Sequence, residues 1–280
     1  MTATNERERL LQNAPVTERR IELAGFSTAV LEAGAGPPMV LLHGPAAYAA
    51  GWLPAIPALA AGHRVIAPDL PGHGATSGPD APLDADAVLS WLAALVDRTC
   101  PTPPVIVGQL LGGAIAARFA AGSPGSVRAL VLVVPFGLAP FAPTPAFGAA
   151  MTGYLTDPTG DSHDTLWRHC VHDLDDVRSR LGGQWDAMKR YNLALARTPA
   201  VAGALHTLLE LFAMPSIPDD VLGRIAVPTT LVWGRDDAIV PVSIGEAAAA
   251  RYGWPIHVLD NAGNEPAIED PDAFVAAVTS

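Results

Sequence analysis

Nine residues near the middle of the chain, V-I-V-G-Q-L-L-G-G at 105–113, constrain the fold more than any other stretch. A short apolar run rich in valine and isoleucine meets Gly108, and a helical pattern then runs from Gly112 to Ala121. An apolar run, a glycine and helical spacing in this order indicate a buried strand, a sharp turn and a helix. Leu110 stands in the middle of the turn, and its side chain has no nucleophilic atom.

The same alternation of apolar runs and helical patterns extends to both sides of this stretch. Two extended segments around Gly25 predict a hairpin at the edge of a sheet. Further buried strands are predicted at 38–42, 64–68, 128–135, 229–233 and 256–259, with helices near 52–61, 83–96, 243–252 and 271–278. Strands that are apolar throughout are typical of a parallel sheet covered on both faces. We therefore predict an α/β fold with a mostly parallel sheet flanked by helices.

The strand pattern stops between Phe136 and Leu222. Proline and glycine are frequent at 135–153, and helical patterns follow near 164–181, 184–196 and 201–212. A long helical segment between two strands favours an inserted helical cap. The prediction is a core formed by residues 1–135 and 222–280, with a helical cap or lid at 136–221.

Composition excludes several classes of function. The chain has 280 residues and a formal net charge of −11, which disfavours nucleic acid and anionic membranes as partners. Its first twenty residues lack the apolar region of a signal peptide, and no apolar run approaches the roughly 18–20 residues of a membrane span. Two cysteines suit a reducing compartment. We expect a soluble, cytoplasmic monomer or homodimer.

Four motifs together resemble a known family. They are M-V-L-L-H-G ending at Gly44, A-P-D-L-P-G-H-G at 67–74, the strand–turn–helix stretch, and L-V-W-G-R-D-D-A-I-V-P at 231–241. In this order they are similar to the motifs of the α/β-hydrolase fold superfamily, and the helical segment resembles a cap-bearing member. The strand–turn–helix stretch resembles the family's nucleophile elbow, G-x-S-x-G. The resemblance implies an α/β-hydrolase fold with an inserted cap.

The resemblance also implies a degenerate catalytic triad. Leu110 stands in the serine place, Asn264 of G-N-E-P stands in the histidine place, and Asp237 remains in the place of the acid. The first oxyanion donor falls on Pro45, which has no N–H, so Leu111 is the remaining donor. The expectation from these residues is that the protein is not a serine hydrolase.

The leading functional hypothesis is therefore a non-hydrolytic, cofactor-independent enzyme of the cyclase, lyase or C–C bond-forming type. Its expected substrate is a small hydrophobic, aromatic or polycyclic intermediate of natural-product biosynthesis, confined in an enclosed pocket. One alternative is a non-catalytic protein that binds a hydrophobic ligand. A further alternative is a cofactor-free oxygenase of a self-ionising aromatic substrate.

Three polar residues are the catalytic candidates. Asp237 is either a general base with a raised pKa or a carboxylate hydrogen-bonded to Asn264 or to its own loop. Gln109 either binds a substrate carbonyl or satisfies loop backbone. Asn264 suits orientation better than proton transfer, since an amide donates and accepts without a change of charge.

The remaining candidates are expected to surround the substrate. Leu110, Leu111 and Pro45 are expected to line the pocket, and His43 either lines it or buttresses its own loop. The cap aromatics Trp167, Trp185 and Tyr191 either form the packing face of the cap or also roof the pocket. The cap also carries His163, His169, His172 and His206, and one of these is an alternative replacement for the lost base. Neither a metal site nor a nucleotide cofactor is predicted.

Overall fold

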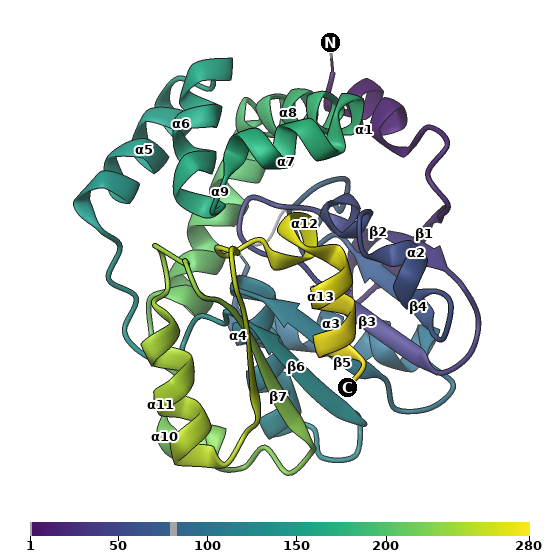
Figure 1. Cartoon of the computed structure of the whole chain (residues 1–280). Coiled ribbons are helices and arrows are strands. Elements are labelled where there is room, and N and C mark those ends of the chain that lie inside the picture. Colours follow the sequence, from purple (N-terminus) through teal and green to yellow (C-terminus); the bar gives the residue numbers. More distant parts are fainter. Residues whose placement is uncertain (1, 79–82) are drawn as a thin grey trace.

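One eight-stranded sheet forms the centre of the molecule (Figure 1). The computed structural model describes residues 2–78 and 83–280, so residue 1 and residues 79–82 of the predicted core lie outside the described residues. The strand order is β1-β2-β4-β3-β5-β6-β7-β8. The strands are β1 (Thr17–Leu23), β2 (Phe26–Ala33), β3 (Pro38–Leu42), β4 (Arg64–Pro68), β5 (Val105–Gln109), β6 (Ala129–Val133), β7 (Thr229–Gly234) and β8 (Ile256–Leu259).

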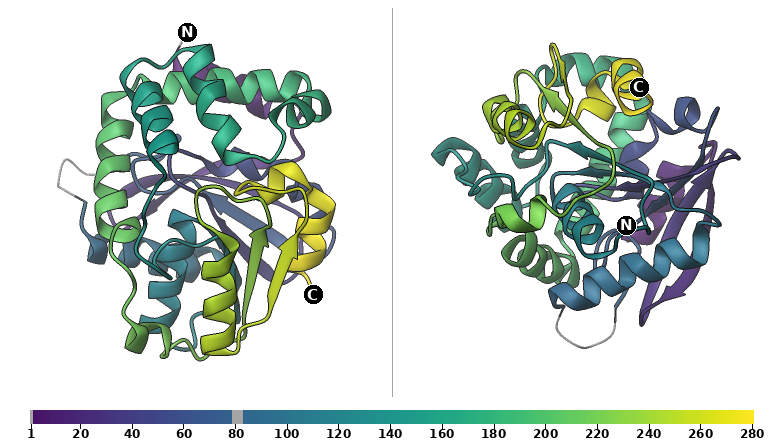
Figure 2. Two further views of the ribbon diagram at one scale, coloured as in Figure 1. Left: turned by 60° about the vertical axis from the view of Figure 1, so that its left-hand side comes forward. Right: turned by 90° about the horizontal axis from the view of Figure 1, so that it is seen from below.

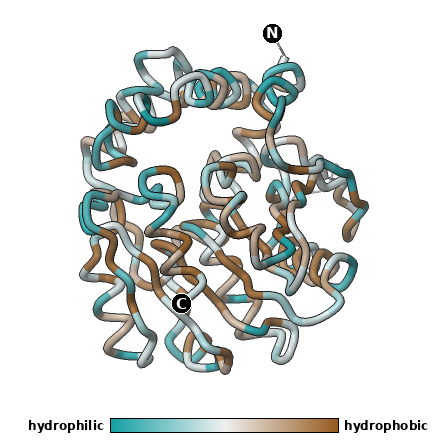
Figure 3. The backbone as a smooth tube through the Cα atoms, turned by 45° about the vertical axis from the view of Figure 1, so that its right-hand side comes forward, coloured by the Kyte–Doolittle hydropathy of each residue, from teal (hydrophilic) through white to brown (hydrophobic). Residues whose placement is uncertain are grey.

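The sheet is parallel from β4 to β8 and antiparallel at one edge. β1 pairs with β2 in the predicted hairpin, and β2 pairs with β4 in the antiparallel sense. All five residues of β3 and of β5 are buried, as expected for strands covered on both faces. In the hydropathy view many of the apolar segments run through this sheet (Figure 3).

Helices cover both faces of the sheet and confirm the predicted α/β class. α13 (Pro271–Val278) packs with α2 (Ile56–Leu59) on one face, and α3 (Ala85–Thr99) packs with α4 (Leu111–Gly122) on the other (Figure 2). The remaining elements of the core are η1 (Ala49–Trp52), α10 (Asp219–Leu222), α11 (Val242–Tyr252) and α12 (Pro266–Glu269).

A helical layer lies above the sheet between β6 and β7 in the sequence (Figure 1). It contains α5 (Pro145–Thr156), α6 (Gly160–Cys170), α7 (Leu174–Leu181), α8 (Gly183–Ala196), α9 (Pro199–Leu208) and η2 (Leu209–Ala213). The structure gives the bounds of these helices. That residues 136–221 form a cap separate from the core stays a prediction.

Several helices differ from the expected ones. The helix expected near 52–61 is instead a 3-10 turn followed by the short α2. The helical pattern at 164–181 belongs to two helices, because Asp173 caps the start of α7 with its carboxylate. Near the N-terminus, α1 (Ala3–Leu11) packs against α8.

Candidate functional site

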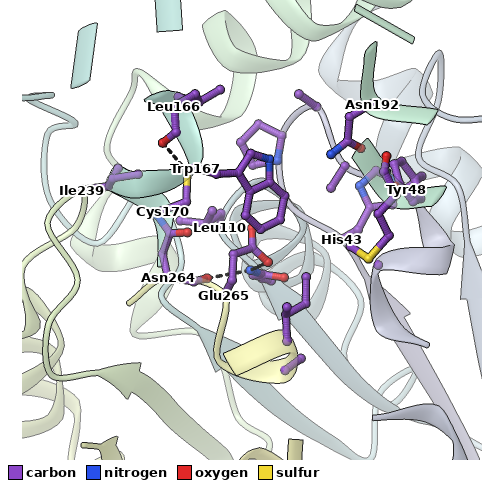
Figure 4. A pocket seen from close by; sticks show the side chains of 18 of the residues that line it. His43, Tyr48, Leu110, Leu166, Trp167, Cys170, Asn192, Ile239, Asn264 and Glu265 are labelled. Carbon is purple, nitrogen blue, oxygen red and sulfur yellow. Dashed lines mark hydrogen bonds between the residues drawn. The ribbon is translucent and has the colours of Figure 1, made fainter. Parts of the chain in front are cut away.

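A cavity of about 110 Å³ lies between the sheet and the helical layer (Figure 4). Its floor comes from residues that follow the carboxyl ends of the strands, and its roof comes from α5, α6 and α8. Ligands of α/β sheets bind outside these strand ends. The lining residues are His43, Pro45, Ala46, Ala47, Tyr48, Gly51, Trp52, Gln109, Leu110, Phe136, Phe147, Met151, Tyr154, Leu166, Trp167, Cys170, Met188, Asn192, Ile239, Asn264, Glu265, Ala267 and Ile268.

Leu110 lies at the floor in a strained backbone conformation with φ of 45° and ψ of −107°. The two flanking glycines allow the strand and helix to approach closely enough for this turn. A Cβ on Gly108 would lie 2.5 Å from the carbonyl oxygen of Gly112, and a Cβ on Gly112 would lie 2.3 Å from that of Leu42. The predicted strand, sharp turn and helix are confirmed.

Gln109, Asn264 and Glu265 supply polar groups to the floor. Asn264 and Glu265 lie close together there (Figure 4). The Gln109 side-chain amide donates to the backbone carbonyl of Asn264 at 2.7 Å and to Glu265 Oε2 at 2.9 Å. Gln109 therefore contacts both the loop backbone and a second cavity residue. Burial raises the pKa of Glu265 to about 7, against the hydrogen bond from Gln109, which lowers it.

Glu265 is a cavity residue that none of the sequence predictions included. It directly follows Asn264 in the G-N-E-P motif, so an acidic side chain beside a candidate site residue was the available signal. Glu269 holds this loop, since its carboxylate accepts hydrogen bonds from the backbone N–H groups of Gly263 and Glu265. It also accepts from the N–H of His172, which ties the loop to the helical layer.

Asp237 lies in the loop after β7 and is not among the cavity-lining residues. Its Oδ1 accepts hydrogen bonds from the backbone N–H groups of Ile239 at 2.7 Å and Val240 at 2.9 Å. Burial raises the pKa of Asp237 to about 7, although these two hydrogen bonds lower it. Asp237 Oδ2 and both polar side-chain atoms of Asn264 are buried without a partner among the described residues.

His43 lines the cavity but is held by two backbone contacts. Its Nδ1 lies 2.8 Å from the Gly44 carbonyl oxygen, and its Nε2 accepts from the N–H of Leu70 at 3.0 Å. Burial lowers the pKa of His43 to about 3, so the ring is neutral and braces the loops after β3 and β4.

The other sequence candidates divide between the cavity and its surroundings. Pro45, Leu110 and Trp167 line the cavity, as do Gln109, Asn264 and His43. The residues Leu111, Trp185 and Tyr191 are buried but are not part of the lining. Trp185 packs against Trp167 with ring centroids 4.9 Å apart, and Tyr191 packs against Tyr48. The substrate-binding and catalytic roles of all these residues stay predictions.

The histidines of the helical layer occupy different environments. His163 is fully buried among aromatic rings, His172 pairs with Asp236 at 3.0 Å, and the side chain of His206 is largely exposed. In residues 2–78 and 83–280 no three His, Cys, Asp or Glu side chains gather as a possible metal site. None of the described helices is both long enough and apolar enough to cross a bilayer.

Comparison with known proteins supports the fold and corrects the expected chemistry. The chain is 30% identical over 273 residues to a pimeloyl-[acyl-carrier protein] methyl ester esterase of Aeromonas hydrophila. This alignment covers 90% of this chain and 98% of that protein. It is 30% identical over 252 residues to a 2-hydroxy-6-oxononadienedioate/2-hydroxy-6-oxononatrienedioate hydrolase of Pseudomonas putida, covering 84% of each chain. The structure matches a 2-hydroxy-6-oxo-6-phenylhexa-2,4-dienoate hydrolase from a Rhodococcus species with a TM-score of 0.80 and 26% identity, covering 92% of this chain and 95% of that one.

These relatives contradict the predicted non-hydrolytic chemistry. They are named esterase or hydrolase, so the expectation of a cyclase, lyase or other non-hydrolytic enzyme of natural-product biosynthesis is wrong. The expectation that the protein is not a serine hydrolase conflicts with the same relatives. The prediction depended on the side chains at positions 110 and 264 alone.

The matched sequence covers most of the chain and the whole site. The model of the alpha/beta hydrolase family matches residues 39–277, which include all strands from β4 to β8. The eight-stranded sheet with flanking helices is the fold of the solved hydrolases, as predicted. This chain belongs to the alpha/beta hydrolase family.

Proposed function

We propose that this protein hydrolyses a small, neutral, apolar ester in the cavity between the sheet and the helical layer, with Glu265 as the general base. The observation that carries the proposal is a carboxyl of raised pKa held by Gln109 beside the elbow. The named esterase and hydrolase relatives support hydrolysis as the reaction type.

The contacts of Glu265 suit proton transfer. Gln109 engages Oε2, which leaves Oε1 as the oxygen that accepts a proton from water. A base is most effective when its pKa lies near the working pH, and a pKa of about 7 meets this condition. Gln109 in turn is anchored on the Asn264 carbonyl, so the base is positioned by a loop contact.

In the proposed reaction Leu110 and Asn264 stand in the serine and histidine places of a degenerate triad, and the helical layer acts as a cap. Because Leu110 supplies no nucleophilic atom, water attacks the ester carbonyl carbon while Glu265 takes its proton. The carbonyl π bond opens and its electron pair moves to oxygen, where the N–H of Leu111 at the start of α4 stabilises the negative charge. The intermediate then re-forms the carbonyl, breaks the bond to the alcohol oxygen, and the leaving alcohol receives the proton from Glu265.

The wall of the cavity favours an uncharged substrate. Aromatic and aliphatic side chains dominate the lining, and no lysine or arginine is found among the described lining residues. A carboxylate on the substrate would meet Glu265 without a compensating cation. The proposed substrate is therefore a neutral ester, in contrast to the dienedioates named for one relative.

Ester turnover with a charge-neutral variant tests the proposal. We expect the wild-type protein to hydrolyse methyl and p-nitrophenyl esters of short carboxylic acids that carry no other ionisable group. Glu265→Gln should lower kcat/KM by about 10²- to 10⁴-fold, since general base catalysis contributes this much. The matched control is Glu246→Gln, an exposed carboxyl on α11, which should leave turnover unchanged.

Two results would overturn the proposal. One is unchanged turnover in Glu265→Gln with wild-type melting temperature. The other is a covalent acyl adduct on the protein, detected by intact mass spectrometry during turnover, since direct attack by water forms none.

A further inference from the structure

A hydrogen-bonded chain of three polar side chains, with the fully buried His163 at its centre, ends at the roof of the cavity. Asn192 on α8 lines the cavity, and its Nδ2 lies 3.0 Å from Nε2 of His163 on α6. His163 Nδ1 lies 3.1 Å from Oδ1 of Asp164. The proposed hydrolysis uses none of these residues.

Asp164 fixes the proton on His163. Its other oxygen, Oδ2, is paired with Lys189 at 2.7 Å and with Arg178. Burial raises the pKa of Asp164, but hydrogen bonds from Lys189, His163 and Arg178 outweigh this and lower it to about 2. The carboxylate is therefore an acceptor only, and His163 Nδ1 must carry the hydrogen that it receives.

His163 in turn fixes the amide of Asn192. Burial lowers the pKa of His163 to about 4, so near neutral pH the ring is uncharged and holds one proton. With that proton on Nδ1, Nε2 is an acceptor and Asn192 must donate to it through Nδ2. Aromatic rings hold the imidazole in place on three sides, namely those of Tyr154, Trp167 and Trp185.

We infer that the carbonyl oxygen of Asn192 is a fixed hydrogen-bond acceptor in the cavity roof, which selects ligands bearing a hydroxyl group on an apolar body. Asn192 and Glu265 reach the cavity from different walls (Figure 4). The inference rests on the cavity of the proposed function and specifies its substrate as an ester with a hydroxyl distant from the scissile bond. Asn192 is a specificity-determining residue, and His163 and Asp164 are positioning residues.

Binding of two ligands of equal shape tests the inference without turnover. The probes are 2-naphthol and 2-methylnaphthalene, whose dissociation constants are measured by equilibrium dialysis. Asn192→Leu should reduce the preference for 2-naphthol over 2-methylnaphthalene by about tenfold, the effect of one hydrogen bond. The matched control is Gln184→Leu, an amide on the same helix outside the cavity lining, which should keep the wild-type preference.

Asp164→Asn tests the positioning chain. In this variant Lys189 and Arg178 hold the oxygen of the new amide on their side, so its NH₂ faces His163 Nδ1 and the imidazole proton moves to Nε2. Asn192 then turns its amide to accept from Nε2 and presents NH₂ to the cavity. The variant should gain a preference for 2-naphthaldehyde, which accepts but cannot donate, over 2-methylnaphthalene, and the wild type should lack this preference.

The outcomes separate this inference from the proposed function. An unchanged ligand preference in both Asn192→Leu and Asp164→Asn, with wild-type melting temperatures, would overturn the inference. Failure of ester hydrolysis with the preference intact would remove the proposed reaction alone.

Discussion

At the elbow, the absence of a Cβ atom on two glycines allows the turn to form. Leu110 has φ of 45°, a conformation that costs a residue with a side chain about 1–3 kcal/mol. The close packing of Gly108 and Gly112 maintains this turn, since any Cβ there meets backbone atoms of the neighbouring strand or helix. Backbone atoms have little freedom to move away, so the glycines are required by contact.

Gly112→Ala should therefore be strongly destabilising. The new Cβ would lie 2.3 Å from the Leu42 carbonyl oxygen, so β3 and α4 must separate. We expect a loss of at least about 3 kcal/mol in the free energy of unfolding. Gly122→Ala is the control at the end of the same helix, where a Cβ meets nothing within 4 Å, and it should be neutral or stabilising by up to about 1 kcal/mol. Equal stability of the two variants in urea denaturation would contradict the packing argument.

The raised pKa of Glu265 also predicts how stability depends on pH. Burial raises this pKa from 4.5 to about 7 in the fold, against the hydrogen bond from Gln109, and Glu269 and Asp237 raise it further. Between these values the native state keeps a proton that the unfolded chain has lost. The contribution of Glu265 is therefore fully present below pH 4.5 and is lost as pH rises through about 7.

Glu265→Gln should make the free energy of unfolding fall less steeply between about pH 5 and 7. The side chain of glutamine has the same shape and no proton to lose in this range. Urea denaturation at several pH values measures the slope, and Glu246→Gln should retain the wild-type slope. If Glu265→Gln also retained it, Glu265 would have an ordinary pKa in the fold.

At the scale of elements, α1 connects the helical layer to the sheet. Arg7 on α1 pairs with the buried Asp69 at 2.8 Å and with Glu18 at 2.7 Å, and it donates to the Tyr191 hydroxyl on α8. Asp69 follows β4 and accepts from the backbone N–H of Ala49 and of Ala75. One guanidinium thus joins the sheet, the loop after β4 and the roof of the cavity.

Arg7→Met should destabilise the protein by about 3–5 kcal/mol, because it leaves Asp69 as a buried charge without its cation. Arg224→Met provides the comparison. Its ion pair with Asp220 is exposed, so its loss should cost less than about 1 kcal/mol. Thermal unfolding of both variants measures the difference, and similar melting temperatures would show that the Arg7 pair adds little.

Elements with a local sequence pattern could be predicted from the sequence, whereas features that depend on contacts between distant residues could not. The hairpin around Gly25 and the parallel strands have local patterns, and the structure contains them. α5 also has a local signal, because Pro145 stands in its first turn. No helix was predicted there, because the proline-rich segment before it is typical of a loop. The role of α1 depends on contacts between Arg7 and Tyr191, which no local pattern predicts.

The candidate site shows the same limit. Leu110 and Asn264 were found because motifs place them, and both line the cavity. Glu265 is hydrogen-bonded to Gln109, 156 positions away in the sequence, and its pKa is raised by burial in the folded chain, so no local pattern marks it. The ordered chain from Asp164 to Asn192 likewise joins two helices.

At the scale of the whole molecule, the sheet and the helical layer together form the cavity. The sheet supplies the polar floor through the loops after its strands, and the helical layer supplies an apolar roof with one amide. Glu269 links the layers by accepting from the N–H groups of both Gly263 and His172. Glu265 lines the cavity between the two layers and burial raises its pKa, so the proposed catalysis depends on both layers.

The pH dependence of kcat/KM for a neutral ester is the most direct test of Glu265 as the base. A general base acts as its carboxylate, so kcat/KM should rise about tenfold per pH unit below pH 7 and level off above it. The rise should be absent in Glu265→Gln and unchanged in Glu246→Gln. The same rising limb in Glu265→Gln, with kcat/KM near that of the wild type, would contradict the assignment.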